Sequence, residues 1–575
     1  MTTNATHPGD VPGAGARAKR FWRIDGWSLL TVAIASLIAV PVVVVLAHVL
    51  VPTGEIWAHL AATLLPTYIA NSLWLMVGVG SGTLVIGVGT AWLVTMCRFP
   101  GRRIFEWALL LPMAVPAYVI AYTYTGLLEF SGPVQETLRS VTGWGWGDYW
   151  FPEIRSLPGA IAMLTLVFYP YVYLLSRAAF LEQSICVLEV SRTLGCTPFQ
   201  AFRSVALPLA RPAVATGVAL ALMETLNDFG TVEYFAVDTF TTGIFRTWYG
   251  LGEPAAAAQL AAALMVFILV LVLMERLSRG GGRIHHTSQR YRSLPGYPLA
   301  GMRRFFAVAA CAVPVLLGFA LPGSTLLAWA IETANEMVDA QFFSLAVNSF
   351  VLATVASLLA VAIAVLIAYG LRLRPSPVRS AAARIASMGY AVPGAVIAVG
   401  VLIPFAWLDG VINDWTRAAF GMEPGLILSG TIVAVTFAYV VRFLAVSFNA
   451  VEASFAKITP HMDDAARCLG KRPGQILTKV HLPIMGGSLL TAGLLVFVDV
   501  MKELPATLIL RPFNFDTLAI RTYQLASDER LTDASSAALA IVAVGIIPVI
   551  LLSVAIARSR PGSRTVSGGS EGPER

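Results

Sequence analysis

Twelve long apolar runs constrain this chain more than any other feature of its sequence. A helix needs about 20 apolar residues to cross the roughly 30 Å hydrocarbon core of a bilayer. Runs of this kind occupy residues 28–50, 71–96, 105–128, 158–180, 212–230, 256–275, 305–330, 348–370, 385–408, 427–449, 487–505 and 534–557. Only 13% of the 575 residues are charged, against about a quarter in an average soluble domain. The sequence therefore predicts an all-α integral membrane protein with about 12 transmembrane helices and excludes a soluble enzyme.

The basic residues lie mostly on one side of these runs. Tails and loops on that side contain 31 of the 40 Lys and Arg residues, the other side contains 7, and Arg442 and Lys502 lie within runs. Positively charged loops stay on the cytoplasmic side of a membrane. An even number of spans places both ends of the chain on the same side. We therefore expect a multi-pass protein of the bacterial cytoplasmic (inner) membrane with both termini in the cytoplasm.

The chain contains an internal repeat of about half its length. Two matches share an offset of 277 residues, Asn71-Ser72 with Asn348-Ser349 and Ala114-Val115-Pro116 with Ala391-Val392-Pro393. Three more share an offset of 275, Leu194-Gly195 with Leu469-Gly470, Leu207-Pro208 with Leu482-Pro483, and Arg246-Thr247 with Arg521-Thr522. Six spans in each half give both halves the same orientation, related by an axis along the membrane normal.

The repeat and the apolar runs divide the chain into five segments. We expect a cytoplasmic tail at 1–27, a first transmembrane half at 28–277 with its core at about 62–277, a cytoplasmic linker at 278–303, a second half at 304–558 with its core at about 344–556, and a tail at 559–575. The linker contains three consecutive glycines and no apolar periodicity, which is typical of a flexible connection.

Two cytoplasmic loops, one in each half, share one spacing. Each has an acidic residue, a glycine six positions later, and a Leu-Pro whose proline lies thirteen positions after the glycine. The residues of the first loop are Glu189, Gly195, Leu207 and Pro208, and those of the second are Asp464, Ala465, Ala466, Gly470, Leu482 and Pro483. A short helix that ends at a glycine in the left-handed conformation, before a Leu-Pro that begins the next span, would form a stiff projection under the membrane. Such a loop could transmit motion, or it could simply connect two spans.

These loops resemble the EAA loop of permease subunits of binding-protein-dependent ABC importers. The departures are Val190-Ser191 in place of two alanines and Asp464 in place of glutamate. The resemblance implies a type I ABC importer permease, two ABC ATPase subunits docked on the loops, and an extracytoplasmic substrate-binding protein. His461 and His481 flank the second loop, and we expect both to be solvated.

The chain lacks the sequence of an ATP site. No G-x-x-x-x-G-K-[ST] phosphate cradle occurs, so ATP and Mg are expected in the partner ATPase. We expect no catalytic residue, no cofactor bound by this chain, no nucleic-acid partner, and contact with the lipid bilayer.

Ionisable side chains lie within the fifth apolar run of each half. Glu224, Asn227 and Asp228 are spaced i, i+3, i+4, which predicts one helical face. Their counterparts at an offset of 275 are Asp499, Lys502 and Glu503. Charged groups at the bilayer centre are costly and generally face a bundle interior or a wet cavity. We interpret these six as the lining of a translocation pathway that suits a cation. The alternative is a structural pairing of Lys502 with Asp499 and Glu503.

The stretch from Glu224 to Phe235, continued by Thr241 to Trp248, resembles the ferric-iron importer permeases, which are also fused two-half chains. This resemblance implies ferric iron as the substrate, and the metal-ligating residues remain unknown. ABC permeases for thiamine, polyamine or aminoethylphosphonate share the architecture and stay open as alternatives. An ion-coupled secondary transporter would also explain two six-span halves, but it would not explain the paired loops.

Overall fold

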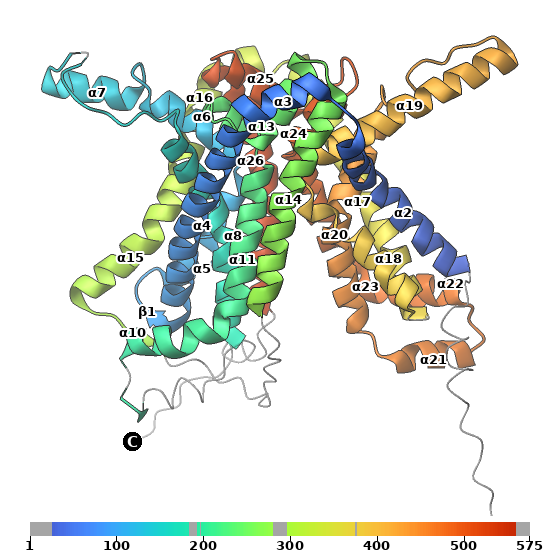
Figure 1. Ribbon diagram of the computed structural model, residues 1–575. Coiled ribbons are helices and arrows are strands. Elements are labelled where there is room, and N and C mark those ends of the chain that lie inside the picture. The colour runs from blue at the N-terminus through green and yellow to red at the C-terminus, as the bar shows by residue number, and fades with distance from the viewer. Residues whose placement is uncertain are drawn as a thin grey trace, which may run out of the picture. The chain divides into compact units, whose positions relative to one another are not determined.

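The computed structural model describes residues 26–145, 147–182, 193–195, 197–279, 296–373 and 376–558 and is built almost entirely from helices (Figure 1). Eleven described helices are long and apolar enough to cross a membrane. A twelfth span is possible if two helices joined by a sharp bend are counted together. The prediction of an all-α membrane protein with about 12 spans is confirmed.

The helices of the first half begin with α2 and end with α14. Their bounds are α2 Gly26–Ala47, α3 Gly54–Thr63, α4 Leu65–Met96, α5 Arg102–Ala108, α6 Ala117–Leu128, α7 Pro133–Thr142, α8 Leu157–Glu182, α10 Pro198–Ala201, α11 Leu207–Asn227, α12 Gly230–Tyr234, α13 Phe240–Phe245 and α14 Pro254–Arg279. A two-residue strand, β1 (Cys97–Arg98), lies between α4 and α5.

The second half has the same order of long helices. Their bounds are α15 Gly301–Val315, α16 Leu321–Met337, α17 Ala340–Leu373, α18 Pro377–Ala386, α19 Gly394–Phe420, α20 Ile432–Ala456, α21 Pro460–Cys468, α22 Pro473–Ile476, α23 Leu482–Met501, α24 Pro505–Leu510, α25 Leu518–Ser527 and α26 Leu531–Arg558. Strand β2 (Tyr297–Pro298) precedes α15 and pairs in parallel with β1.

The span expected at 105–128 is not one straight helix. The segment Arg102–Ala114 meets Ala117–Thr142 at a bend of 91°. Val115, just before Pro116, has an extended backbone with ψ of 122°, because a following proline disfavours the helical conformation of the residue before it. In the second half α19 likewise starts directly after Pro393. The repeated Ala-Val-Pro is therefore a helix break in both halves.

The described chain forms two compact units that do not coincide with the two halves of the repeat. Unit 1 consists of the residues up to Val40 together with 356–390 and 439–496, and unit 2 consists of 41–355, 391–438 and the residues from 497 onward. In unit 2, α4 packs against α8 and α11, and α11 packs against α14 (Figure 1). Helix α26 packs against α16 and α25, and α19 packs against α24. Each unit thus contains residues of both halves.

Aromatic contacts at or just before the first helix of each half join the two halves within one unit. In unit 1, Trp27 packs edge-on against Tyr369 of the second half, with ring centroids 5.6 Å apart. In unit 2, Tyr297 lies 6.4 Å from Trp92 of the first half. Trp92 and Tyr369 are repeat equivalents at an offset of 277. Each half therefore anchors the start of its first helix on the other half.

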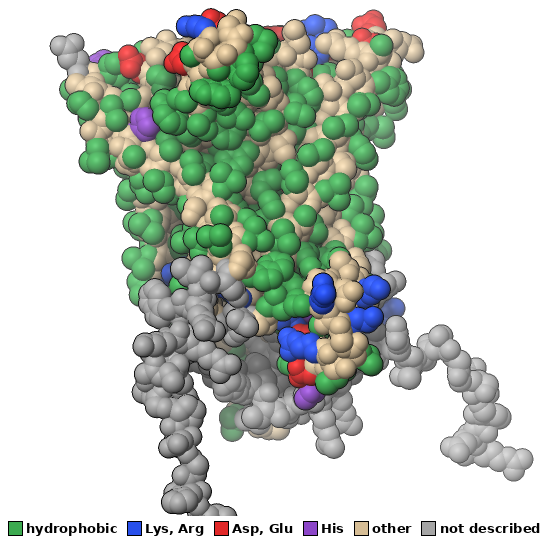
Figure 2. Space-filling model, turned by 90° about the vertical axis from the view of Figure 1, so that its right-hand side faces the viewer, with side chains coloured by type: hydrophobic (Ala, Val, Ile, Leu, Met, Phe, Trp, Pro, Cys, Tyr) green, Lys and Arg blue, Asp and Glu red, His purple; other side chains and the backbone are tan. Residues whose placement is uncertain are grey.

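The surface has the pattern of a protein in a lipid bilayer. Figure 2 shows one face on which apolar side chains cover the middle, while acidic and basic side chains gather towards the two ends. Many large apolar side chains on the long helices are exposed, among them Leu73, Trp74 and Val77 on α4. In water this exposure would be costly, whereas lipid tails solvate it.

Candidate functional site

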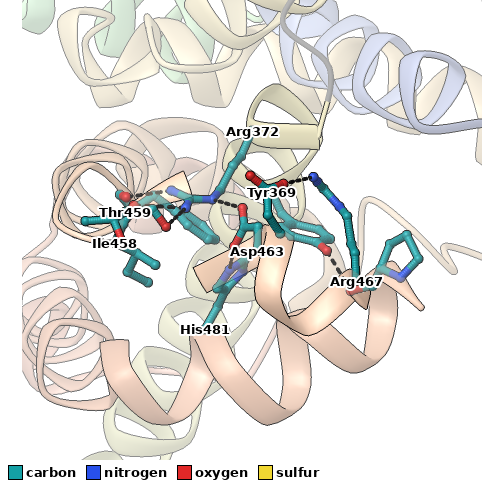
Figure 3. Close-up of polar contacts among 10 residues, drawn as sticks. Tyr369, Arg372, Ile458, Thr459, Asp463, Arg467 and His481 are labelled. Carbon is teal, nitrogen blue, oxygen red and sulfur yellow. Dashed lines mark hydrogen bonds and ion pairs between the residues drawn. The ribbon is translucent and has the colours of Figure 1, made fainter. Parts of the chain in front are cut away.

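The second of the two predicted loops is held by a buried ion-pair network in unit 1 (Figure 3). Arg372, in the last turn of α17, donates from Nε to Asp463 Oδ2 on α21 at 2.8 Å. His481 Nε2 lies 2.6 Å from Asp463 Oδ1. The Arg372 side chain also donates to the carbonyls of Phe455 and Ile458, where α20 ends. One guanidinium therefore joins α17, α20 and α21.

The network is shielded from water and shifts the ionisation of its carboxylate. The side chain of Asp463 is 10% exposed and that of His481 is 0% exposed. Burial acts to raise the pKa of Asp463, but the hydrogen bonds and charges of Arg372 and His481 outweigh it and hold that pKa below its usual range. The expectation that His481 is solvated is therefore wrong, because Asp463 draws the ring into the interior.

The opposite face of α21 is open. Asp463 and Ala466 are the buried residues of this helix, while Asp464 and Ala465 are exposed. The predicted residues of the second loop thus divide between a buried face, which holds the helix, and an exposed face, which is free to contact another protein.

Both loops end at a glycine in the left-handed conformation. The φ angle is +80° at Gly195 and +73° at Gly470, a region that residues with a Cβ rarely adopt. The leucines that precede them, Leu194 and Leu469, are 77% and 78% exposed. This confirms the predicted glycine cap and shows two matching apolar tips.

The remainder of the first loop is described only in part. Glu189 lies outside the described residues, as do Val190 and Ser191. Leu207 and Pro208 begin α11, and Leu482 and Pro483 begin α23. Each Leu-Pro therefore starts the helix that continues into the fifth span of its half.

The fifth-span residues do not all share one helical face. Helix α11 ends at Asn227 and α23 ends at Met501, so Asp228, Lys502 and Glu503 lie beyond the helix ends and the one-face prediction is wrong for these three. Each carboxylate instead folds over the short helix that follows. Asp228 accepts from the backbone nitrogens of Thr231 and Val232 at 3.0 and 3.1 Å. Glu503 accepts from those of Ala506 and Thr507 at the same two distances.

The other predicted pathway residues, Glu224, Asn227, Asp499 and Lys502, lie in unit 2. Residues from the first half of the repeat lie close to residues from the second half there. Lys502 Nζ lies 2.9 Å from Asp499 Oδ1, and Glu224 and Tyr171 are within electrostatic reach of Lys502. The side chains of Asp499 and Lys502 are 23% and 24% exposed. Asn227 Oδ1 accepts from the backbone nitrogen of Gly394 at 2.7 Å, at the start of α19. The structure therefore brings Glu224, Asp499 and Lys502 together and gives Asn227 a capping contact.

The repeated Asn-Ser pair has a structural role that sequence reasoning missed. Asn71 Nδ2 donates to the carbonyl of Asp238 at 2.8 Å, and Asn348 Nδ2 donates to that of Asp516 at 3.2 Å. Both asparagines therefore hold the chain that returns after the broken fifth span. The recurrence of these asparagines at an offset of 277 was the sequence feature that could have indicated this role.

The described residues contain no group of three or more His, Cys, Asp or Glu side chains that could hold a metal ion. The hydroxyls of Tyr118, Tyr122 and Tyr169 are buried and have no hydrogen-bond partner among the described residues.

Known proteins resemble this chain over part or most of its length. Residues 83–279 match the family described as the binding-protein-dependent transport system inner membrane component. The Fe(3+)-transport system permease protein FbpB 2 of Haemophilus influenzae is 27% identical over 84% of this chain and 89% of its own length. The ferric transport system permease protein FbpB of Actinobacillus pleuropneumoniae is 25% identical over 77% of this chain and 64% of its own. The sulfate transport system permease protein CysT of Salmonella typhimurium is 28% identical over 35% of this chain and 72% of its own.

Proposed function

We propose that this chain is a multi-pass membrane permease of the binding-protein-dependent transport class, which its family match and its apolar helices support, and that it imports ferric iron as the permease subunit of an ABC importer. An extracytoplasmic binding protein would deliver the iron, and two ABC ATPase subunits on the cytoplasmic side would bind ATP and Mg and supply the energy. Both termini would face the cytoplasm. The likeness to ferric permeases over 84% of the chain supports the choice of substrate.

The observation on which this proposal mainly depends is the pair of matched loops. At repeat-equivalent positions both have a left-handed glycine after an exposed leucine, Leu194-Gly195 and Leu469-Gly470. An apolar tip on a stiff turn suits insertion into a groove of a partner protein. In a secondary transporter such paired tips would have no partner to contact.

Continuous helices link the loops to the charged residues of the fifth spans. Leu207 begins α11, and Glu224 lies 17 residues further along the same helix, about 26 Å away at 1.5 Å per residue. Asp499 lies equally far from Leu482 on α23. A helix moves as a rigid rod over this length, so motion of the docked loops would move Glu224 and Asp499.

We assign the pathway lining mainly to Glu224, Asp499 and Lys502, whose side chains are partly exposed. Two carboxylates and one ammonium group leave this cluster net acidic, which favours a cation over an oxyanion. Asn227, Asp228 and Glu503 would hold the breaks of the fifth spans on either side of this cluster. We therefore keep these three residues in the proposed pathway, where they would act indirectly by fixing the positions at which the fifth spans break.

The proposal can be tested in vesicles that contain the chain, its ATPase and its binding protein. We expect ATP-dependent uptake of labelled ferric iron in preference to thiamine, polyamine or aminoethylphosphonate. Uptake driven by an ion gradient without ATP would instead identify a secondary transporter. The purified chain alone should hydrolyse no ATP. Measurable ATP hydrolysis by it would contradict the proposal that a separate ATPase subunit supplies the energy.

A further inference from the structure

The buried network of the second loop has no chemical counterpart in the first. Its members are Tyr369, Arg372, Asp463 and His481, and the repeat-equivalent residues at offsets of 277 and 275 are Trp92, Thr95, Leu188 and Ala206. Leu188 lies outside the described residues, but its identity alone excludes an ion pair at that position. The two loops therefore share their exposed glycine caps, whereas the ionisable residues of the network occur only at the positions of the second loop.

The network fixes both ends of the second loop. Arg372 Nη1 and Nη2 donate to the carbonyls of Phe455 and Ile458 at 2.8 and 2.9 Å, just before α21 begins. Tyr369, one turn earlier on α17, donates from its hydroxyl to the carbonyl of Pro473 at 2.6 Å, just after the loop. The final turn of α17 thus holds the start and the end of the loop through directional hydrogen bonds.

Helix α21 needs this support because it has little of its own. It has nine residues, fewer than the roughly 12 to 15 that an isolated helix requires. Asp463 lies in the middle of it and bonds to α17 through Arg372 and to the start of the next long helix through His481. Charge-assisted bonds of this kind are strong and depend on orientation, so they fix the rotation of α21 as well as its position.

Aromatic and polar contacts surround the described residues near the first loop. Trp92 lies 5.7 Å from Phe180 and 5.0 Å from Phe202, measured between ring centroids. Thr95, at the position of Arg372, donates from its hydroxyl to the carbonyl of Ala91 within its own helix at 2.6 Å. Arg177 Nη2 on α8 lies 3.0 Å from Glu106 Oε2 on α5. This ion pair joins α8 to α5, whereas the network of the second loop joins α17 to the loop itself.

We propose that Asp463 is a positioning residue for energy coupling, because its buried bonds to Arg372 and His481 hold the loop at 460–470 against α17 and α20. This inference rests on the proposed function. The network makes α21 move together with α17 and α20. A displacement of α21 by a docked ATPase subunit would therefore also displace these long helices. When the carboxylate is neutralised, α21 can rotate in place and ATP is hydrolysed with less movement of the spans.

The first test measures mobility directly in the full-length chain in lipid. Spin labels are placed at position 194 or 469, which are matched in exposure, in a chain whose five native cysteines are replaced. Asp463→Asn should raise the mobility of the label at 469 and leave the mobility of the label at 194 unchanged. Unchanged mobility at 469 in Asp463→Asn would overturn the inference.

The second test measures iron transported per ATP hydrolysed in the assembled transporter. Asp463→Asn should lower this ratio severalfold while the ATPase subunits stay bound, and Glu452→Gln, an exposed carboxylate of α20, should leave it unchanged. If Asp463→Asn does not fold, Arg372→Lys replaces it, because lysine keeps the charge but its compact ammonium group lacks the planar fork with which the guanidinium reaches Asp463 and two backbone carbonyls. A lower yield of folded protein with an unchanged ratio would reduce Asp463 to a structural residue. Absence of ATP-dependent uptake by the unmutated chain would instead contradict the proposed function.

Discussion

Asp228 and Glu503, 275 residues apart in the chain, make the same three contacts to the short helix that follows each of them. Each carboxylate accepts from two backbone nitrogens and from a threonine hydroxyl, that of Thr231 or that of Thr507. These contacts satisfy amide groups that a helix start leaves unpaired. The two residues therefore stabilise the break in the fifth span of each half.

The capping role makes a prediction about stability that a purely ionic role does not make. Asp228→Ala and Glu503→Ala should each lower the free energy of unfolding by about 1–2 kcal/mol, in the range measured for lost helix caps. Asp228→Asn and Glu503→Gln should cost less, because an amide oxygen still accepts a hydrogen bond. Thermal unfolding in detergent checks this, and a silent Asp228→Ala would argue against the cap.

The charged cluster should behave differently from the caps. Glu224→Gln and Asp499→Asn remove negative charge from side chains that are only partly buried, so we expect cation uptake to fall severalfold, with little change in unfolding temperature for Glu224→Gln. Asp499→Asn and Lys502→Met should both be less stable, because each leaves one member of the ion pair at 2.9 Å without its partner. Initial uptake rates and unfolding temperatures are measured together, and full uptake by both carboxylate variants would remove them from the pathway.

The two cap glycines should tolerate substitution by asparagine and not by valine. At φ of +80° and +73°, a β-branched side chain adds about 1–3 kcal/mol of backbone strain. No neighbouring atom lies within 4 Å of a Cβ built at either position, so backbone strain alone would act. Gly195→Val and Gly470→Val should insert normally and lose uptake, while Gly470→Asn, the matched control, should retain most of it. Normal uptake by both valine variants would show that the caps are dispensable.

The depressed pKa of Asp463 makes its contribution to stability depend on pH. Because the pKa is lower in the folded chain than in the unfolded one, the carboxylate stabilises the fold at any pH above its ordinary value of about 3.9. This stabilisation is lost as the pH falls through the lowered folded-state pKa. Asp463→Asn should therefore be less stable than the unmutated chain at neutral pH, by about 1–3 kcal/mol.

Unfolding curves measured at a series of pH values test that sign. The difference in stability between the two chains should shrink as the solution is acidified below pH of about 4. A difference that grows on acidification would mean that the charge of Asp463 is not stabilised by Arg372 and His481.

Much of the architecture could be read from the sequence because membrane insertion is governed by local composition. Apolar runs of span length and the bias of Lys and Arg are properties of short segments, and so is the glycine cap at Gly195 or Gly470. The repeat could be found from residue pairs at one offset. None of these features depends on which segments meet in space.

Contacts between distant residues could not be read in this way. Asp463 stands next to the predicted Asp464, yet its partners Arg372 and His481 lie 91 and 18 residues away, and no local pattern joins them. The one-face prediction for Asp228 failed for a related reason, since its i+4 spacing from Glu224 assumes a helix that in fact ends at Asn227.

The sequence by itself therefore determined that this protein spans a membrane, that it is duplicated and where its two matched loops lie, because each of these follows from the chemistry of consecutive residues. Only the tertiary structure decided that Asp228 and Glu503 cap helices, that Trp27 packs on Tyr369 of the other half, and that the second loop is held by a buried ion pair. Such contacts arise because a folded chain must pair its buried polar groups with whichever partners the packing brings near, and that choice is made by the whole fold.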